Sequence, residues 1–179
     1  KIDKAKSTIS VHLSDLIDLG IISEKEHPTD KRIKIYSLNS KLLGTSEVPF
    51  DEHYSEILEN LRDNSGKSYE FLKSLFHLIR YGLTSFGLDI HPALKEIGRD
   101  AGFKLSENFD SEELEDLLVE VKEFWDDNKL GAVEIEGKDT LLVSDCFDCC
   151  DIPDVGNTFC SLDEGLIEGI IEGKLGLKV

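Results

Sequence analysis

No stretch of this sequence approaches the roughly 18 consecutive apolar residues that a membrane-spanning helix requires. No signal-peptide pattern opens the chain either. We therefore expect a soluble, cytoplasmic protein with no membrane segment. The sequence also contains no methionine and begins at Lys1, in what looks like the turn before a helix, so we expect the natural protein to be longer at its N-terminus.

Fingerprints of the common enzyme classes are absent too. The nucleotide-binding patterns G-x-G-x-x-G and G-K-[ST] do not occur, and no Ser-His-Asp or Cys-His pair stands at an informative spacing. The acidic residues of segment 111–127 have nothing around them in sequence that would form a pocket, which favours a solvated helix face over paired catalytic carboxylates. We therefore do not expect an enzyme.

Negative charge dominates the 179 residues, which carry a net charge of −17, but it is unevenly distributed. Residues 1–45 hold eight Lys or Arg and six Asp or Glu, a net of +2, whereas the remainder holds twelve basic and thirty-one acidic residues, a net of −19. Only residues 1–45 have a net charge that allows them to bind the phosphate backbone of a nucleic acid. Electrostatic repulsion should hold the acidic remainder of the chain away from it.

The segment from Lys6 to Ile22 has the pattern of a short amphipathic helix. Its apolar side chains recur at i, i+4 and i+7 and form one stripe: Ile9, Leu13 and Leu16. Gly20 is a typical helix stop. Elsewhere the segment carries short hydrogen-bonding side chains suited to base edges or phosphates, namely Ser7, Ser10 and His12.

Two alternating segments follow, 21–26 and 32–38, around the turn Pro28-Thr29-Asp30, and they predict a β-hairpin. On these residues the sequence resembles the ArsR-type winged helix-turn-helix regulators. The recognition helix of that family has the form S-x-x-S-x-H-L-x-x-L-x-x-x-G, and its wing has the form D-x-R-x-x-x-Y-x-L. The matching positions are Ser7, Ser10, His12, Leu13, Leu16 and Gly20, then Asp30, Arg32, Tyr36 and Leu38.

The resemblance implies that residues 1–45 bind DNA. The candidate contact residues are Lys6, Ser7, Ser10, His12, Lys31 and Arg32. Further phosphate contacts from Lys1, Lys4 and Lys34 would make the affinity strongly dependent on salt. His12 is then a DNA-contact residue and not a catalytic base, because no partnered nucleophile lies near it in sequence. The alternative is a degenerate winged helix that does not bind DNA and serves only as a protein-interaction module.

The segments that follow predict longer helices. Residues 39–50 form a turn-rich connector and the best domain boundary. Asp51 is expected to cap a helix that ends at residues 64–66 and carries Tyr54, Ile57, Leu58 and Leu61. A more apolar helix should be buried or line a dimer interface through Tyr69, Leu72, Leu75, Phe76 and Ile79.

An acidic amphipathic helix is expected over Ser111–Asp127. Its inward residues would be Leu114, Leu117, Leu118, Val121 and Trp125, and its outward residues Glu112, Glu113, Glu115, Asp116 and Glu120. Before it, Gly98 and Gly102 stand four apart on one helical face, which permits close approach of another element. After it, residues 132–136 and 140–144 flank Gly137 and predict a second hairpin.

All four cysteines fall within fifteen positions, which in an intracellular protein argues for metal ligation or redox sensing over structural disulfides. Cys146 and Cys149 have the C-x-x-C spacing that presents two thiolates to Zn²⁺ at about 2.3 Å, and Cys160 is able to fold back as a third. The same pair could instead form a reversible disulfide. In that case the acidic neighbours Asp145, Asp148 and Asp151 would raise the pKa of the thiols and slow oxidation.

Cys150 completes this set of metal or redox candidates, and zinc is the candidate cofactor. Buried cysteines that act as small hydrophobes are the plain alternative.

The order of residues in this region resembles the vinyl-4-reductase (4-vinyl reductase) domain. The resemblance spans most of residues 50–179 but is specific only from about Asp145 onward. It rests on the pattern E/D-C-F-x-C followed by Pro153, Gly156, Cys160, Gly165, Gly169 and Gly176. The family implies an α+β sensor fold. A winged helix joined to such a domain resembles the methanogen-specific redox regulators of archaea, which bind promoter DNA as dimers and change state through cysteines.

The sequence departs from the family pattern at its C-terminal end. Family members continue past the position of Val179 with a strand and two further cysteines. In the aromatic-responsive sensors, those cysteines and an acidic residue join the equivalent of Cys160 in binding zinc. Only Cys160 therefore carries over from the resemblance, and the other three cysteines are inferred from their local spacing.

These observations predict an α+β protein with a partial winged helix over residues 1–45 and a sensor domain over residues 46–179 whose C-terminal end is missing. We expect a homodimeric transcriptional regulator that binds promoter DNA and senses redox state, a metal or a small ligand. Oxidation or ligation around Cys160 would repack the glycine-rich helix Leu162–Leu175. The spacing of two recognition helices, roughly 34 Å for paired half-sites, would then change.

The alternative function is a stand-alone protein that binds a small hydrophobic molecule and no DNA. Its pocket would be lined by Phe71, Phe76, Phe86 and Phe103.

Overall fold

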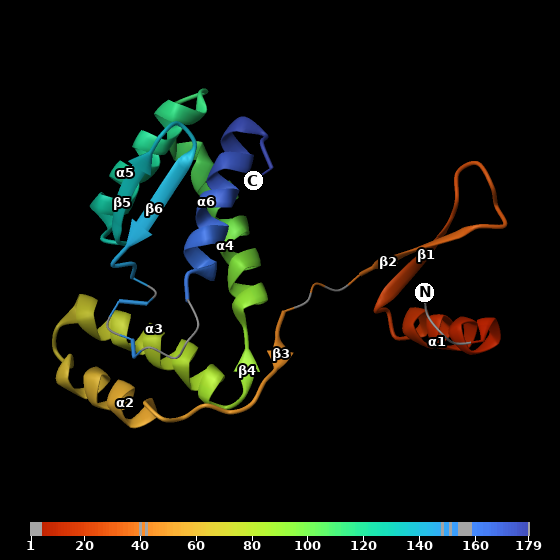
Figure 1. The fold of residues 1–179 in the computed structure, drawn as a ribbon, viewed down its shortest axis with the longest axis horizontal. Helices are drawn as coiled ribbons and strands as arrows, with labels where there is room; N and C mark the ends of the chain where they lie inside the picture. Colours follow the sequence, from red (N-terminus) through yellow and green to blue (C-terminus); the bar gives the residue numbers. More distant parts are fainter. Residues whose placement is uncertain are drawn as a thin grey trace. The chain divides into compact units, whose positions relative to one another are not determined.

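The computed structural model describes residues 5–39, 41, 43–147, 149–150, 152–153 and 159–178. It confirms the α+β class, with helices and small antiparallel sheets (Figure 1). The chain divides into an N-terminal unit, Lys1–Leu42, and a C-terminal unit, Leu43–Val179. Within the described residues, no helix combines the length and the apolar character needed to cross a membrane.

The N-terminal unit consists of one helix and one hairpin, as the sequence predicted. Helix α1 (Lys6–Asp18) is followed by β1 (Ile22–Glu26) and β2 (Lys34–Leu38). The strands pair antiparallel in a register that runs from Ile22 opposite Leu38 to Glu26 opposite Lys34. The side-chain amide of Asn39 donates to the carbonyl of Gly20 (3.2 Å) and ties the end of the hairpin to the end of the helix.

Gly20 ends helix α1 because its φ of +71° lies in the left-handed region that glycine adopts at no steric cost. The N–H of Gly20 donates to the carbonyl of Ile17, and the N–H of Ile21 donates to the carbonyl of Leu16 (2.9 Å). This pair of bonds is the Schellman arrangement, which satisfies carbonyls that the helix end would otherwise leave open. The chain is thereby turned directly into strand β1.

The C-terminal unit contains five helices longer than one turn among its described residues. They are α2 (Tyr54–Asp63), α3 (Ser68–Ser85), α4 (His91–Leu105), α5 (Leu114–Asn128) and α6 (Ser161–Leu175). A 3-10 turn, η1 (Ser106–Asn108), follows α4. The short strands β3 (Thr45–Ser46) and β4 (Leu88–Asp89) pair antiparallel. Strands β5 (Ala132–Glu136) and β6 (Thr140–Ser144) form the second predicted hairpin with the predicted bounds.

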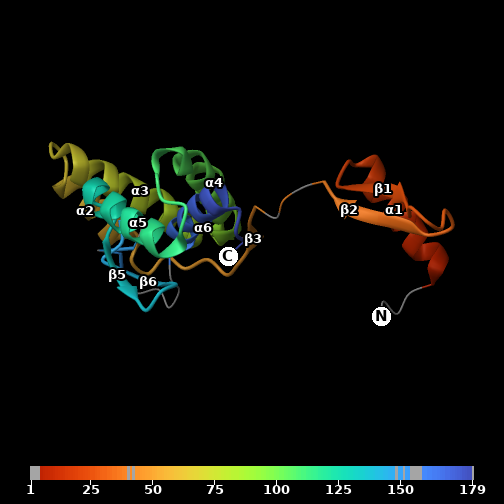
Figure 2. The ribbon, with the colours of Figure 1, turned by 90° about the horizontal axis from the view of Figure 1, so that it is seen from above.

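Helices α4 and α6 lie side by side in both ribbon views (Figures 1 and 2). Glycines from both helices line the contact, namely Gly98 and Gly102 on α4 and Gly165, Gly169 and Gly173 on α6. A Cβ atom on Gly165 would lie 2.9 Å from the backbone nitrogen of Arg99, and one on Gly102 would lie 3.0 Å from that of Ile170. The expectation that the α4 glycines permit close approach of another element is confirmed.

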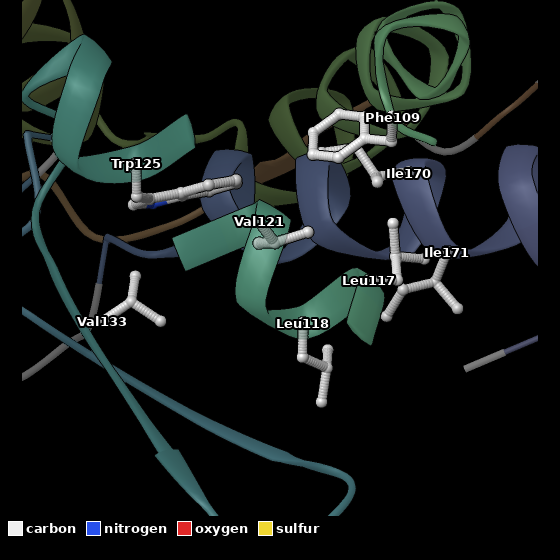
Figure 3. Packing of buried hydrophobic residues seen from close by; sticks show 8 residues of the cluster. All are labelled: Phe109, Leu117, Leu118, Val121, Trp125, Val133, Ile170 and Ile171. Carbon is white, nitrogen blue, oxygen red and sulfur yellow. The ribbon is translucent and has the colours of Figure 1, made fainter. Parts of the chain in front are cut away.

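The main hydrophobic core lies between α5, α6 and the β5–β6 hairpin (Figure 3). All the expected inward residues of α5 take part in it, and Trp125 is fully buried. The core consists of Phe109, Leu117, Leu118, Val121, Trp125, Val133, Ile170 and Ile171. Burying these side chains stabilises the fold by about 1.5 to 3 kcal/mol each, before conformational entropy is counted.

Burial of the expected apolar face of helix α3 is contradicted at Leu72 and Ile79, which are 61% and 54% exposed. The alternative, that this face lines a dimer interface, stays a prediction. The buried face instead carries small and polar side chains: Ser74, His77, Arg80, Tyr81, Gly82 and Ser85. This face packs partly on helix α2 and partly on two aromatic residues from the C-terminal part of the chain, described below, which meet the polar His77 and the cationic Arg80.

Two smaller expectations were also wrong. Helix α2 begins at Tyr54 with His53 at its N-cap and no side-chain cap, so the Asp51 carboxylate does not cap it. Glu120 is not simply a solvated outward residue of α5. Its carboxylate accepts hydrogen bonds from the N–H of Asp110 (2.8 Å), the N–H of Ser111 (2.9 Å) and the hydroxyl of Ser111. It therefore orders the segment that leads into the helix.

Replacing Gly169 by alanine should destabilise the protein by about 3 kcal/mol, because the new methyl group would press against the backbone of Arg99 and Phe103. Gly82→Ala on α3 is the matched control. A Cβ there would meet only Tyr54 at 3.4 Å, so higher helix propensity should leave stability unchanged or raise it by up to about 1 kcal/mol. Urea unfolding measures both changes, and equal effects would refute the close-packing argument.

Hydrogen bonding, first from the Ser111 hydroxyl, lowers the pKa of Glu120 below its ordinary value of 4.5. A lowered pKa in the folded state contributes stability above pH 4.5, and this contribution is lost as the pH falls through the folded-state pKa. Glu120→Gln should therefore cost about 1 kcal/mol at neutral pH, a modest value because the carboxylate is partly exposed. The cost should shrink below pH 4.5. Glu123→Gln, on the exposed side of α5, is the matched control and should leave the free energy of unfolding at neutral pH unchanged in the same series.

Candidate functional site

Three of the four cysteines meet at one place in the C-terminal unit. Cys146 follows strand β6, Cys149 lies three residues further on, and Cys160 is the N-cap residue of α6. The sulfur atoms of all three lie within 4.8 Å of one another. Cys146 and Cys149 form a disulfide whose Cα atoms are 5.7 Å apart. The expectation that Cys160 folds back toward the C-x-x-C pair is therefore confirmed.

A tight turn brings Cys149 to Cys146. The backbone N–H groups of Cys149 and Cys150 both donate to the carbonyl of Cys146, at 3.2 and 2.9 Å. Cys150 is not part of the three-sulfur cluster. Of the acidic neighbours expected to affect the thiols, Asp145 is exposed and has a left-handed φ of 49°. Asp148, Asp151 and the family position Gly156 lie outside the described residues.

Phe147 anchors this turn to helix α3. Its carbonyl accepts a hydrogen bond from Nε2 of the buried His77 (2.6 Å), and its N–H donates to the carbonyl of Leu130 (2.8 Å). Its ring packs against those of Phe76 and Tyr69, with centroids 5.6 and 6.1 Å apart. Phe147, the first of the two residues between these cysteines, is thus held on both its backbone and its side chain.

Phe159 anchors the other side of the cluster, directly before Cys160. Its buried ring stacks on His91 at 5.6 Å, and the guanidinium carbon of the buried Arg80 lies 5.0 Å from its centroid. His91 Nδ1 lies 2.6 Å from the hydroxyl of Ser161 at the start of α6. These contacts fix the start of helix α6, where Cys160 is the N-cap residue.

The cluster allows two chemical states that exclude each other. Three thiolates this close together suit a single thiophilic cation such as Zn²⁺, and coordination requires Cys146 and Cys149 to be reduced. In the disulfide state those two sulfurs are no longer available as thiolate ligands. The arrangement therefore has the chemistry to hold a metal in one redox state and to release it in the other.

Sequence reasoning missed the residues of α3 and α4 that support the cluster, namely His77, Arg80 and His91. One signal was available. Ser74, His77 and Arg80 recur at intervals of three within an otherwise apolar helix, which indicates a buried polar face. Phe147 and Phe159, which meet His77 and Arg80, lie more than sixty residues further along the sequence, so no local pattern pointed to these pairings.

The candidate DNA-contact residues of the N-terminal unit are all exposed: Lys6, Ser7, Ser10, His12, Lys31 and Arg32. Lys1 and Lys4 lie outside the described residues. With 3.6 residues per turn, Ser7, Val11 and Ser14 fall opposite the half-buried stripe of α1, whereas Ser10 and His12 lie on its two flanks. Val11, which sequence reasoning missed, is 58% exposed near the centre of the outward face.

Acidic neighbours hold two basic side chains of the hairpin in place. Nε and Nη2 of Arg32 donate to the two carboxylate oxygens of Asp30, both at 3.0 Å, which lowers the pKa of Asp30 and raises that of Arg32. Lys34 pairs with Glu24 across the strands at 2.6 Å, and a hydrogen bond between them raises the pKa of Lys34 and lowers that of Glu24. Lys31 has no such partner within the described part of the chain.

Comparison with known proteins finds relatives in one archaeon. The chain is similar to two uncharacterized proteins of Methanocaldococcus jannaschii, at 32% identity over 110 residues and 27% identity over 109 residues. Each match covers 59% of this chain and 62% or 63% of the relative, so the chain spans less than two thirds of the relatives' length. No family model matches the chain, and no solved structure matches it. Similarity to archaeal proteins is confirmed, and the ArsR-like and vinyl-4-reductase assignments stay predictions.

The expected aromatic ligand pocket was wrong in its lining. Phe86 and Phe103 are 70% and 56% exposed, so they do not enclose a cavity. Phe76 is engaged with Phe147 and with Arg80, whose guanidinium carbon lies 5.7 Å from its centroid. These phenylalanines therefore give no support to a hydrophobic ligand.

Reduced protein should bind one Zn²⁺ per chain, and Cys146→Ser or Cys160→Ser should weaken binding by about 100-fold or more because each removes a ligand. Cys150→Ser is the matched control and should leave the affinity unchanged. Competition against a zinc chelator measures the affinities. If the Cys150 and Cys160 variants lose affinity equally, the three-sulfur assignment fails.

Proposed function

We propose that the protein is a transcriptional regulator in which the helix and hairpin of residues 6–38 contact promoter DNA and the three-cysteine cluster senses redox state or a metal. One observation carries the DNA-binding part. Helix α1 is followed directly by a β-hairpin. The polar outward face of the helix and the basic tip of the hairpin are both exposed. This is the arrangement with which winged helices read a major groove and an adjacent backbone.

The outward face of α1 has chemistry suited to base edges. The hydroxyls of Ser7 and Ser14 can donate or accept hydrogen bonds, and the methyl groups of Val11 suit contact with thymine methyls. His12 and Ser10, on the flanks, are placed for phosphates or for the edges of the groove. Specificity would then come from few contacts, and affinity largely from charge.

Charge supports the same assignment. The first 45 residues have a net charge of +2, and the remainder has a net charge of −19. Lys31 and Arg32 lie at the turn of the hairpin, where Asp30 holds the guanidinium of Arg32 in a fixed orientation. A phosphate or a minor groove would meet a preorganised cation there, which reduces the entropy lost on binding.

The sensing part of the proposal rests on the two exclusive states of the cysteine cluster. Loss of the disulfide or capture of a metal would alter the turn from Cys146 to Cys150, which Phe147 holds on helix α3. We propose that the protein acts as a homodimer, in which a small shift at this turn changes the distance between two DNA-contact helices. Paired half-sites tolerate little change in that distance.

Arg32→Ala should weaken binding to the DNA upstream of the protein's own gene by about tenfold and reduce the salt dependence of the affinity by about one unit of slope. Val11→Asp should abolish sequence preference, because a carboxylate would face the base edges. Fluorescence anisotropy titrations at several salt concentrations measure both effects, with Lys67→Ala in the C-terminal unit as the control. Each titration is run on reduced and on oxidised protein.

Three outcomes distinguish the parts of the proposal. Different affinities in the two redox states support both parts. Equal affinities remove the redox switch and leave DNA binding intact. No binding in either state removes the DNA-binding role and favours the stand-alone ligand-binding alternative.

A further inference from the structure

Helix α3 turns an apolar side to solvent, while its buried face carries mostly small and polar side chains. The outward side chains form a row that we call the α3 stripe: Leu72, Leu75, Ile79, Leu83 and Phe86. Leu72, Ile79 and Phe86 are 61%, 54% and 70% exposed, and the other two are partly exposed. Since a surface helix normally turns its polar side to water, the α3 stripe has the character of a contact face for another molecule.

The α3 stripe is free of charge in a strongly acidic chain. Every α3 position within about 60° of the centre of the stripe is uncharged. The whole chain has a net charge of −17, so most surfaces of one copy would repel the same surface of another. Helix α4 shows the contrast, because its exposed Ile97 shares a helix side with Asp100 and Lys104. The α3 stripe therefore allows two such chains to meet without opposing like charges.

The spacing of the α3 stripe is the same read from either end. Leu72 and Phe86 each lie seven residues from Ile79, and Leu75 and Leu83 each lie four residues from it. Two copies of α3 that pack antiparallel about a two-fold axis at Ile79 would therefore place Leu72 against Phe86 and Leu75 against Leu83. A two-fold interface requires such self-complementarity, and the mean spacing of 3.5 residues is the one at which two helices mesh. The symmetry of the stripe favours a second copy of this chain over an unrelated partner.

We propose that the protein forms a homodimer in which the α3 stripes of two copies pack antiparallel, with the two-fold axis at Ile79. The proposal rests on the proposed function, which includes a homodimer, and it identifies the contact face. The 18 residues of α3 span about 27 Å. One helix pair of this length is a small interface beside the roughly 1,600 Å² of a standard stable complex, so the dimer should be reversible, with a micromolar dissociation constant.

The α3 stripe borders the cysteine turn. Phe76 and Tyr69, at one edge of the stripe, pack on the ring of Phe147, which lies between Cys146 and Cys149. A displacement of the turn would therefore move side chains at the edge of the dimer contact. This gives the redox state or the metal a direct physical route to the arrangement of the two copies.

Sedimentation equilibrium of the full chain, in the disulfide state that the structure shows, tests the interface. The wild-type chain should convert reversibly from monomer to dimer between about 1 and 200 µM. Ile79→Glu should weaken dimerisation by about 100-fold or more, because two glutamates would face each other across the axis. Ile97→Glu is the matched control, since it places the same charge at an isoleucine of α4 that is 57% exposed, and it should leave dimerisation unchanged. Both positions are exposed, so neither glutamate should disturb folding, which circular dichroism checks.

A photo-crosslink tests the antiparallel arrangement without adding a charge. Benzoylphenylalanine in place of Ile79 should give a covalent dimer on irradiation, and mass spectrometry should place the crosslink between Leu75 and Leu83 of the second copy. The same amino acid in place of Ile97 should give no covalent dimer.

The proposal is overturned if the wild-type chain stays monomeric over this concentration range, if Ile79→Glu dimerises as the wild type does, if the two glutamate variants weaken dimerisation equally, or if the crosslink lies outside α3. None of these measurements involves DNA. A failure of the α3 interface is therefore distinguishable from a failure of DNA binding, which the anisotropy titrations detect separately.

Discussion

The backbone-to-backbone contact between α4 and α6 is the constraint on which the C-terminal unit depends. Glycines on each helix face the main chain of the other, so at these positions the two backbones approach with no Cβ atom between them. Ion pairs flank the contact, with Lys95 joined to Glu168 (2.8 Å) and Arg99 joined to Glu172. A larger side chain at these positions, or a closer approach of the two main chains, would bring backbone atoms into collision.

Because of this close helix contact, the cysteines differ in how firmly the structure holds them. Cys160 begins α6, so it is fixed to α4 and, through Ile170 and Ile171, to the main core. Cys146 and Cys149 belong to a turn held on α3 by a few ring contacts and one histidine hydrogen bond. A change of redox state or metal would therefore displace the turn more readily than it would repack α6. This differs from the expectation from the sequence, which was that α6 would repack. The α4–α6 pair acts as the fixed reference.

Local patterns predicted much of the fold because the interactions behind them are local. The two hairpins, the stop at Gly20 and the inward face of α5 follow from periodicity and turn chemistry, and the glycine spacing on α4 predicted a close neighbour without naming it. The face of α3 was not predictable in the same way. His77 and Arg80 are buried against Phe147 and Phe159, and the identity of those partners appears only when the chain has folded.

In the turn from Cys146 to Cys150, too, one feature was predictable from the sequence and another depends on the folded structure. The C-x-x-C spacing predicted that Cys146 and Cys149 would meet, because a turn of that length returns the chain on itself. In the structure the N–H groups of both Cys149 and Cys150 donate to the carbonyl of Cys146, so the turn brings both residues close to it. Adjacent side chains leave the backbone in different directions, so only one of the two can face Cys146 and Cys160. The turn therefore selects which thiols share a cation or a disulfide, and backbone hydrogen bonding sets the chemistry of the site.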